Sequence, residues 1–586
     1  MSQHKADRFW SHDMIRARLN RRGLVKGAAA GGAGIALGSR LGGYRAMAQT
    51  PTASVVDPST DEPPVELPLV EEKTTLRILQ VQNPSVENYE TNTFTQWLEE
   101  QTNVHIEWQT VPLDEAEAAL TLRLASGDYP DILMDFNPTP SVIQLYGSQG
   151  IFIPLNDLIE QHGTMTRLHW ETTPSARVAS TAPDGNIYSL PSINDCYHCT
   201  MSAKLWINQE WLDTLGLEMP QTTEEYAEVL RAFKDGDPNG NGEADEIPLT
   251  GSGIVGGAWH GSPDHYFMNS FIYHPGNDLR LIQDNGKVIA IYAQEAWREG
   301  IKYLAGLHAE GLLSPEIFTN DRDQLRALGN GRDGVAIVGS VPAGWFGEFM
   351  TFTAGESGPW DAYTAVPPLE GPDGTRYSMH DTFQAPIVGT FIITDKCQNP
   401  ELAMKWADFL GRVEPTTRSI HGVKDEDWRW AYEGEIGIDG EQAWWHSITD
   451  VANIPSQNIH WSQDGPSVRT AKYRLSQVVP DPDNITAGAN LEVVLYNLTK
   501  ERYAPYAPEQ PMNLPPMYFT VEQANEVATI LPQLETYVNE TFAQAVTGQL
   551  DIESEWDNYL ANLEAIGLST FVDLHQQVLD ETNANS

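Results

Sequence analysis

The sequence has 586 residues, with 36 Lys and Arg against 81 Asp and Glu, which gives a formal charge of −45. A chain of this charge repels nucleic acids and anionic membranes, so we exclude a general nucleic-acid-binding role. The three cysteines are too few for a disulfide-dense scaffold, while 41% hydrophobic residues suffice for sizeable cores and exclude global disorder. The sequence has no run of about 18 apolar residues, which argues against a transmembrane helix.

Residues 1–48 have the layout of an export signal. The run around Arg21 and Arg22 resembles the twin-arginine export motif, a Gly/Ala-rich segment follows at 27–38, and a small-x-small cleavage site ends at Ala48. We predict an exported protein, periplasmic or extracellular and associated with the cell envelope; the alternative is a basic, disordered tail. No cysteine lies near the cleavage site, so we expect no lipid anchor there. The proline-rich, acidic residues 49–72 are typical of an extended linker.

Strands and helices alternate after the linker. We predict strands at 75–81, 104–108 and 132–134 and helices at 93–101 and 114–126. This order of strand, helix, strand, helix and strand is typical of parallel α/β pairing.

A second α/β region follows. It has predicted strands at 204–207 and 334–338, and Thr222 with Glu225 makes a plausible capping pair for the longer of its helices. The predicted helices are at 209–215, 222–233, 298–307, 322–328 and 399–410, and residues 521–578 are mostly helical with breaks near Gly548 and Gly567.

The acidic loop Asp235–Glu246 is the sharpest motif. Calcium is held by six to eight oxygen ligands, which alternate residues of a glycine-containing loop supply. Two registers fit: one begins at Asp235 and matches the full EF-hand pattern, and the other begins at Asp237 and closes a shorter loop. An acidic surface turn is the alternative. Pro248 prevents a simple exiting helix, so we expect a lone structural calcium site.

Cys196 and Cys199 form a second motif, with His198 between them. A redox motif needs a helix at the first cysteine, but the following residues favour extended structure. A zinc site needs four ligands, and only Cys397 remains as a third thiolate. We interpret the pair as a local disulfide formed after export.

Other patterns carry less information. Two glycine-rich stretches, at 329–334 and 251–256, match G-x-G-x-x-G, but neither has the context of a nucleotide site. Carboxylate spacing has no weight among 81 acidic residues. The 17 tryptophans matter more, because an exported protein can use them as flat surfaces for sugar rings, although each alone is more often a core residue.

Several stretches in order resemble the family 1 extracellular solute-binding proteins of ABC importers, and in particular a calcium-containing branch with alginate-oligosaccharide-binding and LipO-like proteins. The resemblance extends over nearly all of 74–580 and is carried by GDYPDI at 127–132, GIFIPL at 150–155, DGNIYSLPSINDCYHC at 184–199, LWINQEWLDTLGL at 205–217, DPNGNGEADEIPL at 237–249, VPPLEGPDG at 366–374, NPELAMKWADF at 399–409 and TGQLDIESEWDNYLANLEAIGL at 547–568.

The resemblance implies a periplasmic-binding-protein-like α/β fold with two lobes, a hinge and a ligand cleft between the lobes. We expect lobe 1 at 73–193 and 386–460, and lobe 2 at 194–385, with the mainly helical residues 461–586 completing lobe 2. The resemblance also selects a calcium register. Its ligands are Asp237, Asn239, Asn241, Glu243 through its carbonyl, Asp245 and Glu246. Many relatives carry a lipobox cysteine, which this chain lacks.

We therefore expect a non-enzymatic, monomeric receptor that captures an oligosaccharide and delivers it to the permease subunits of an ABC importer. The sugar is expected to be neutral or weakly charged, because the acidic surface opposes an anionic glycan. An exported glycoside hydrolase and a binding protein for a peptide or another non-sugar solute are the alternatives. The residues predicted to line the cleft are Asp135, Asn194, Asp195, Tyr197, Trp259, Trp345, Arg376 and Trp461.

Overall fold

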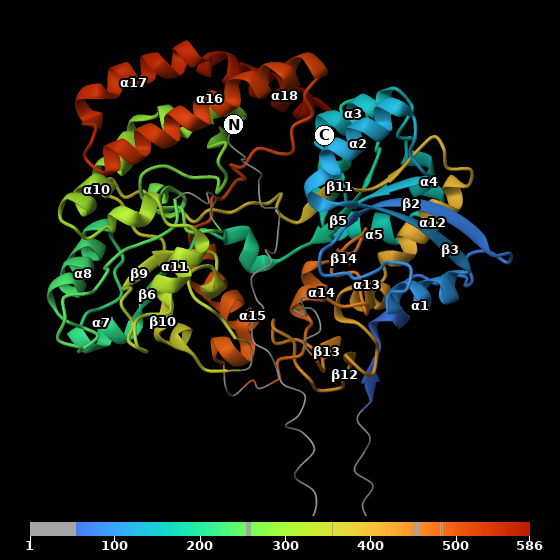
Figure 1. The fold of residues 1–586 in the computed structure, drawn as a ribbon, viewed down its shortest axis with the longest axis horizontal. Coiled ribbons are helices and arrows are strands. Elements are labelled where there is room, and N and C mark those ends of the chain that lie inside the picture. Colours follow the sequence, from blue (N-terminus) through green and yellow to red (C-terminus); the bar gives the residue numbers. More distant parts are fainter. Residues whose placement is uncertain are drawn as a thin grey trace, which may run out of the picture.

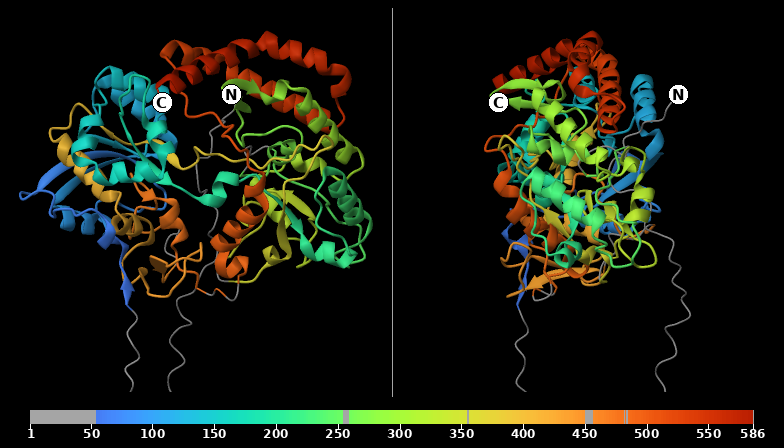
Figure 2. Two further views of the ribbon diagram at one scale, coloured as in Figure 1. Left: turned by 180° about the vertical axis from the view of Figure 1, so that it is seen from behind. Right: turned by 90° about the vertical axis from the view of Figure 1, so that its left-hand side faces the viewer.

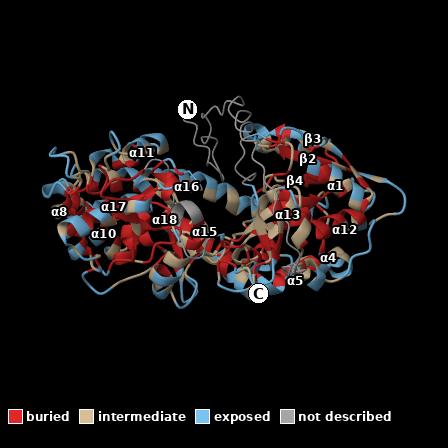
Figure 3. Ribbon diagram, turned by 90° about the horizontal axis from the view of Figure 1, so that it is seen from below, coloured by how far each residue is buried: buried red, intermediate tan, exposed pale blue. Residues whose placement is uncertain are grey.

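The computed structural model describes residues 54–253, 259–353, 356–449, 456–480, 482 and 485–585. They form two α/β lobes side by side, as predicted, each with its own buried core (Figures 1 and 3). The predicted export signal lies outside the described residues. Among the described helices, none is both long and apolar enough to cross a membrane.

The first lobe is built on a six-stranded mixed sheet. Strand β2 pairs in parallel with both β3 and β4, which confirms the parallel pairing predicted for this region. Strand β11 runs antiparallel between β4 and β5. In spatial order the strands are β14 (Val468–Arg469), β5 (Leu190–Asn194), β11 (Pro386–Ile393), β4 (Ile132–Met134), β2 (Thr74–Gln82) and β3 (Val104–Pro112).

Helices cover both faces of this sheet because its central strands are apolar on both sides. Ile78 and Ile132 pack into a core with helices α1, α4 and α12, whereas the adjacent Leu79 and Leu133 pack on the opposite face against α2 and α3. The helices of this lobe are α1 (Thr93–Thr102), α2 (Ala116–Ser126), α3 (Pro140–Ser148), α4 (Asn156–His162), α5 (Thr164–Thr172), α6 (Pro174–Ser180), α12 (Pro400–Leu410), α13 (Val413–His421) and α14 (Ala471–Leu475).

The second lobe has a three-stranded antiparallel sheet, in which β6 (Leu205–Asn208) lies between β10 (Tyr363–Val366) and β9 (Ser340–Pro342). No strand lies at the predicted residues 334–338; the strand of this region is β9, which begins two residues further along the chain. The capping box of Thr222 and Glu225 is confirmed at the start of α8. The lobe also holds the hairpin of β7 (Leu281–Asp284) and β8 (Lys287–Ala290), and the helices α7 (Gln209–Leu215), α8 (Thr223–Asp235), α9 (Pro263–Phe267), α10 (Glu295–Ala309), α11 (Arg322–Gly329) and α15 (Ala487–Leu498).

The C-terminal helices α16 (Val521–Val546), α17 (Ile552–Ile566) and α18 (Leu568–Asn585) pack on the second lobe, where they lie along the top of the view in red (Figures 1 and 2). The segment before them returns briefly to the first lobe. Tyr518 is buried in that lobe's core and donates a hydrogen bond to the carbonyl of Ala179 at 2.7 Å. The chain therefore joins the lobes at this point as well as at the main crossings.

The predicted linker is not free over its whole length. Strand β1 (Val55–Val56) pairs with β12 (Trp428–Tyr432), which also pairs with β13 (Trp445–Ser447). Glu62 then forms a buried ion pair with Arg412 at 3.4 Å and accepts the backbone N–H of Val413 at the start of α13. Residues 55–62 are therefore docked on the first lobe, because they supply a strand partner and a helix cap.

The chain crosses between the lobes after β5, before β11 and after α14. The boundary predicted at 461 is too early, because β14 at 468–469 still pairs in parallel with β5 of the first lobe. Such a short strand carries no clear sequence signal, and its place depends on contacts with residues that are remote in the chain.

Candidate functional site

The ends of several strands in the first lobe meet at the edge from which the crossing segments leave. β2, β4, β5 and β14 all end there, since β4 and β5 run antiparallel to β11 and β14 runs parallel to β5. Ligands of open α/β sheets bind beyond the carboxyl ends of strands. We therefore expect ligand-binding groups at this edge of the first lobe.

Two carboxyl groups, Asp135 and Asp464, lie at this edge. Asp135 directly follows β4 and accepts hydrogen bonds from the Gln80 side chain at 2.8 Å and from the backbone N–H of Gly465 at 2.9 Å. Asp464 accepts a short hydrogen bond from the Tyr89 hydroxyl. Burial raises the pKa of Asp135 to about 7, and burial together with the charge of Asp135 raises the pKa of Asp464 well above its usual range. Carboxyl groups of this kind can accept hydrogen bonds from hydroxyl groups and, when protonated, donate to them.

The backbone around this pair is strained. Asp135, Asn137, Ser462 and Gln463 have positive φ angles of 62°, 44°, 55° and 79°, in the region that side chains disfavour. Such strain gathers at functional sites, where the surroundings must enforce it. Asp135 was predicted from the sequence, whereas the loop at 462–464 was not, because the position of this loop depends on tertiary contacts.

The first crossing segment holds three predicted site residues. Asn194, at the end of β5, accepts a hydrogen bond from Arg474 at 3.3 Å. Burial raises the pKa of the adjacent Asp195 above its usual value, and the charge of Arg474 offsets only part of this rise. The ring of Tyr197 lies 5.1 Å from that of Tyr496, beside a cavity of about 10 Å³. The structure thus brings Asn194, Asp195 and Tyr197 together at the crossing, beside residues of α14 and α15.

Cys196 and Cys199 form a disulfide across this segment, and Cys397 is a free thiol. The ring of His198 lies 3.4 Å from the Cys196 sulfur, and the three residues are close enough together to hold a metal ion. In the bonded state, however, neither sulfur is a thiolate, which is the form that binds zinc. His198 instead contacts Glu492 at 3.2 Å.

Two predicted tryptophans, Trp259 and Trp345, lie on the second lobe close to the crossing. The backbone carbonyl of Trp259 accepts the N–H of Gly344 at 2.9 Å, and its ring lies 6.3 Å from that of His198. Trp345 is only three residues beyond β9, whose end pairs with the beginning of β6. Both side chains are partly exposed. The ring of Trp259 therefore lies beside the first crossing segment, and Gly344, the residue before Trp345, packs against that ring.

The other two predicted cleft residues have different environments. The Arg376 guanidinium stacks on Tyr506 at 4.1 Å and donates to Gln221 at 2.9 Å, so it holds together segments within the second lobe. Trp461 is 0% exposed and its indole N–H donates to Thr95 at 2.8 Å. Its ring therefore belongs to the core of the first lobe, which corrects the expectation of an open stacking surface there.

The predicted calcium loop is a compact turn on the second lobe. Asp245 accepts hydrogen bonds from Asn239 and Asn241, both at 3.1 Å, and Asp237 accepts the N–H of Gly242. The fold thus brings together Asp237, Asn239, Asn241 and Asp245, four of the side chains predicted to form one ligand set. Asp235, by contrast, is an exposed residue at the last position of α8.

Glu246 supplies a direct test of whether this loop suits a cation. Its Oε1 atom is buried and has no hydrogen-bond partner in the structure. Burial raises the pKa of Glu246, and the nearby Asp237 and Asp245 raise it further. A divalent cation at this point would satisfy the orphaned oxygen and offset the repulsion between carboxylates. The residues present therefore fit calcium.

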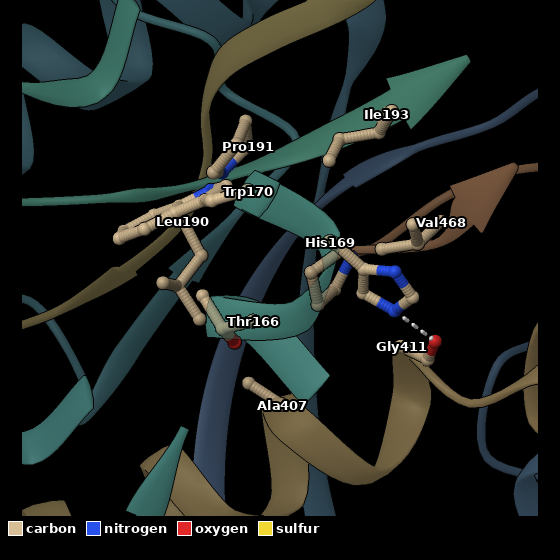
Figure 4. A pocket seen from close by; sticks show the side chains of 10 residues that line it. Thr166, His169, Trp170, Leu190, Pro191, Ile193, Ala407, Gly411 and Val468 are labelled. Atoms are coloured by element: carbon tan, nitrogen blue, oxygen red, sulfur yellow. Dashed lines mark hydrogen bonds between the residues drawn. The ribbon is translucent and has the colours of Figure 1, made fainter. Parts of the chain in front are cut away.

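A cavity of about 20 Å³ in the first lobe has a different character (Figure 4). His169 lies beside it and its Nε2 is 2.8 Å from the carbonyl of Gly411, to which it donates. Burial lowers the pKa of His169 to about 4, so the ring is neutral near pH 7. This space holds about one water molecule and is far too small for a sugar ring. We assign it to packing between α5, α12 and β5.

Known proteins resemble the chain over most of its length. It is 29% identical over 530 residues, 89% of this chain and 93% of the relative, to the fructooligosaccharide ABC transporter substrate-binding protein FusA of Streptococcus pneumoniae. The structure of FusA in complex with kestose has a TM-score of 0.68 at 27% identity, covering 87% of this chain and 100% of FusA. A solute-binding protein of Bifidobacterium longum infantis that binds HMO has a TM-score of 0.71 at 22% identity, over 87% of this chain and 99% of that chain, and it supports the fold alone.

The family of this chain is shown by a match over much of its own sequence, and these relatives agree with it. Residues 84–415 match the bacterial extracellular solute-binding proteins, whose members capture solutes and are not enzymes. The match covers more than half of the sequence and includes parts of both lobes. The chain belongs to the family of bacterial extracellular solute-binding proteins.

Proposed function

We propose that this protein is the substrate-binding receptor of an ABC importer, and that it captures an oligosaccharide between its lobes for delivery to the membrane permease. The observation that carries the proposal is the similarity, over 89% of this chain, to FusA, a fructooligosaccharide-binding protein of the same fold. The chemistry of the predicted site residues supports it. Carboxyl and amide groups on the first lobe suit sugar hydroxyls, and the tryptophans on the second suit sugar ring faces.

The ligand has to enter between the lobes. The cavities beside Tyr197 and His169 measure about 10 and 20 Å³, which excludes a sugar ring from either. We propose instead that the regions carrying Asp135 and Trp345 enclose the ligand together. Closure of this kind is hinge bending, and the crossing segments at Asn194 and after α14 are where it would occur.

We further propose that the loop of Asp237, Asn239, Asn241, Glu243, Asp245 and Glu246 binds one structural calcium ion. The Glu246 oxygen without a hydrogen-bond partner supports this. The related FusA, of which an EF-hand mutant has been solved, also supports it. We also propose that the protein is exported through the predicted signal at 1–48 and acts as a monomer.

The test is calorimetric titration of the calcium-loaded protein with kestose, nystose, neutral galacto- and gluco-oligosaccharides and an acidic uronide, with reducing ends assayed in parallel. We expect binding of a neutral oligosaccharide with no product formed, since the acidic chain disfavours an anion. Sustained release of reducing ends would show a glycoside hydrolase. Binding of peptides with no response to any sugar would refute the sugar assignment and leave the family intact.

A further inference from the structure

Trp345 is held against the backbone at one face of its ring. Gly347 lies directly beneath the six-membered ring, so closely that a Cβ atom at that position would meet the Trp345 Cζ2 atom at 2.3 Å. Any side chain at Gly347 would therefore displace the ring. The requirement for glycine arises from space, since Gly347 does not have a positive φ angle.

The edge of the same ring is fixed by Glu348. The indole N–H of Trp345 donates to Glu348 Oε1 at 3.0 Å, and the Glu348 side chain is only 5% exposed. Its other oxygen, Oε2, lies 2.7 Å from Arg322 Nη2 and 3.0 Å from His260 Nδ1. Glu348 is thus surrounded by polar groups from three separate segments of the second lobe, with Trp345 and Arg322 as donors and His260 as a third polar neighbour.

This arrangement keeps Glu348 ionised. Burial alone would raise its pKa, but the interaction with His260 and the charge of Arg322 hold the pKa below its usual value. A hydrogen bond to a charged carboxylate is stronger and more directional than a neutral one. The Trp345 ring is therefore fixed in orientation on two sides while the side chain as a whole stays partly exposed.

We infer that Glu348 and Gly347 are positioning residues that hold Trp345 as a rigid stacking platform for one sugar ring of the ligand. The inference rests on the proposed sugar-binding function. A platform that is ordered before binding loses less entropy when the ligand arrives, so its orientation contributes to affinity. Neither positioning residue needs to touch the sugar.

The same packing occurs a second time and supplies a matched control. A Cβ atom at Gly358 would meet the ring of Trp360, also at 2.3 Å, but Trp360 is only 3% exposed and belongs to the core. Gly358→Ala therefore imposes the same displacement on a tryptophan that cannot reach a ligand. It should lower the melting temperature without changing sugar affinity.

The experiment measures the affinity of the wild type, Gly347→Ala, Glu348→Gln, Trp345→Ala and Gly358→Ala for kestose and the sugar panel. Circular dichroism confirms folding, and the indole ¹H–¹⁵N signal of Trp345 without ligand reports the hydrogen bond to Glu348. We expect about tenfold weaker binding for Gly347→Ala and Glu348→Gln, a shifted indole signal in both, and no loss for Gly358→Ala. Added to Trp345→Ala, Glu348→Gln should have no further effect on affinity, because it acts through that ring.

The outcomes separate the two claims. Folded Gly347→Ala and Glu348→Gln proteins that bind the sugar as tightly as the wild type would overturn the positioning role and leave the receptor function standing. A further loss from Glu348→Gln in the Trp345→Ala background would show direct contact of Glu348 with the sugar instead. If the wild type binds no sugar at all, the proposed function and this inference both fail. If Glu348→Gln does not fold, the Gly347→Ala variant tests the positioning role, because it leaves Glu348, Arg322 and His260 unchanged.

Discussion

The calcium loop allows two ligand registers, and one pair of substitutions separates them. The shorter register uses Asp245 and excludes Asp235, whereas the full EF-hand pattern begins at Asp235 and does not use the Asp245 side chain. In the structure Asp245 faces Asn239 and Asn241 within the loop, with only 13% of its side chain exposed. We therefore expect Asp245→Asn to impair calcium binding and Asp235→Asn to leave it unchanged.

The size of the effect follows from mass action. A calcium concentration one hundred times the dissociation constant adds about 2.7 kcal/mol to the free energy of unfolding. If the loss of one ligand carboxylate weakens binding about one hundredfold, the same concentration adds only about 0.4 kcal/mol. Asp245→Asn should then lose about 2.3 kcal/mol of calcium-dependent stability. Asp245 also receives hydrogen bonds in the loop, so the comparison must be between calcium and chelator for each variant.

The assay is chemical denaturation of each variant with calcium at a fixed excess and with a chelator, followed by circular dichroism and by calorimetric titration of calcium. Equal losses for Asp235→Asn and Asp245→Asn would refute the shorter register. A wild type whose stability and calorimetric signal do not respond to calcium would refute the site itself.

Three other outcomes follow from the structure. Tyr518→Phe should cost about 1 kcal/mol, because it removes the hydrogen bond to the Ala179 carbonyl while it keeps the ring in the first lobe; denaturant titration measures this, and an unchanged midpoint would contradict it. Glu62→Ala should cost roughly 3–5 kcal/mol by leaving Arg412 buried without its partner, and a cost below about 1 kcal/mol would show that the docked N-terminal segment is dispensable. The raised pKa of Asp135 means that the folded state retains a proton that the unfolded state has lost. The free energy of unfolding should therefore fall as pH rises from about 4 to about 7. Asp135→Asn should reduce this fall, which a pH series of melting temperatures measures.

The local elements of this protein follow from sequence patterns. The helix predicted at 93–101 is α1 at Thr93–Thr102, the strand predicted at 132–134 is β4, and the helix breaks near Gly548 and Gly567 separate α16, α17 and α18. These elements have strong periodicity, clear caps or glycine at their ends, so nearby residues determine them.

Fewer residues of the candidate site could be predicted from the sequence. Asp135 could be found because it directly follows a buried strand. Asp464 could not, since its place depends on a strained loop more than 300 residues further along the chain. Trp461 illustrates the reverse error, because composition favours open aromatic rings in a sugar-binding protein, whereas burial of this ring depends on Thr95 and the surrounding core.

The discontinuity of the first lobe has a consequence for biosynthesis. Its sheet takes the strand β2 from residues 74–82 and the strand β14 from residues 468–469. An emerging chain can therefore pair β2, β3 and β4 early, but the β14 edge stays open until most of the protein has been synthesised. Contacts between residues so distant in sequence also slow folding, because long loops must close before the contacts form. During this interval the backbone edge of β5 lacks its β14 partner, so the half-made chain is the form most exposed to edge-to-edge aggregation and to proteases.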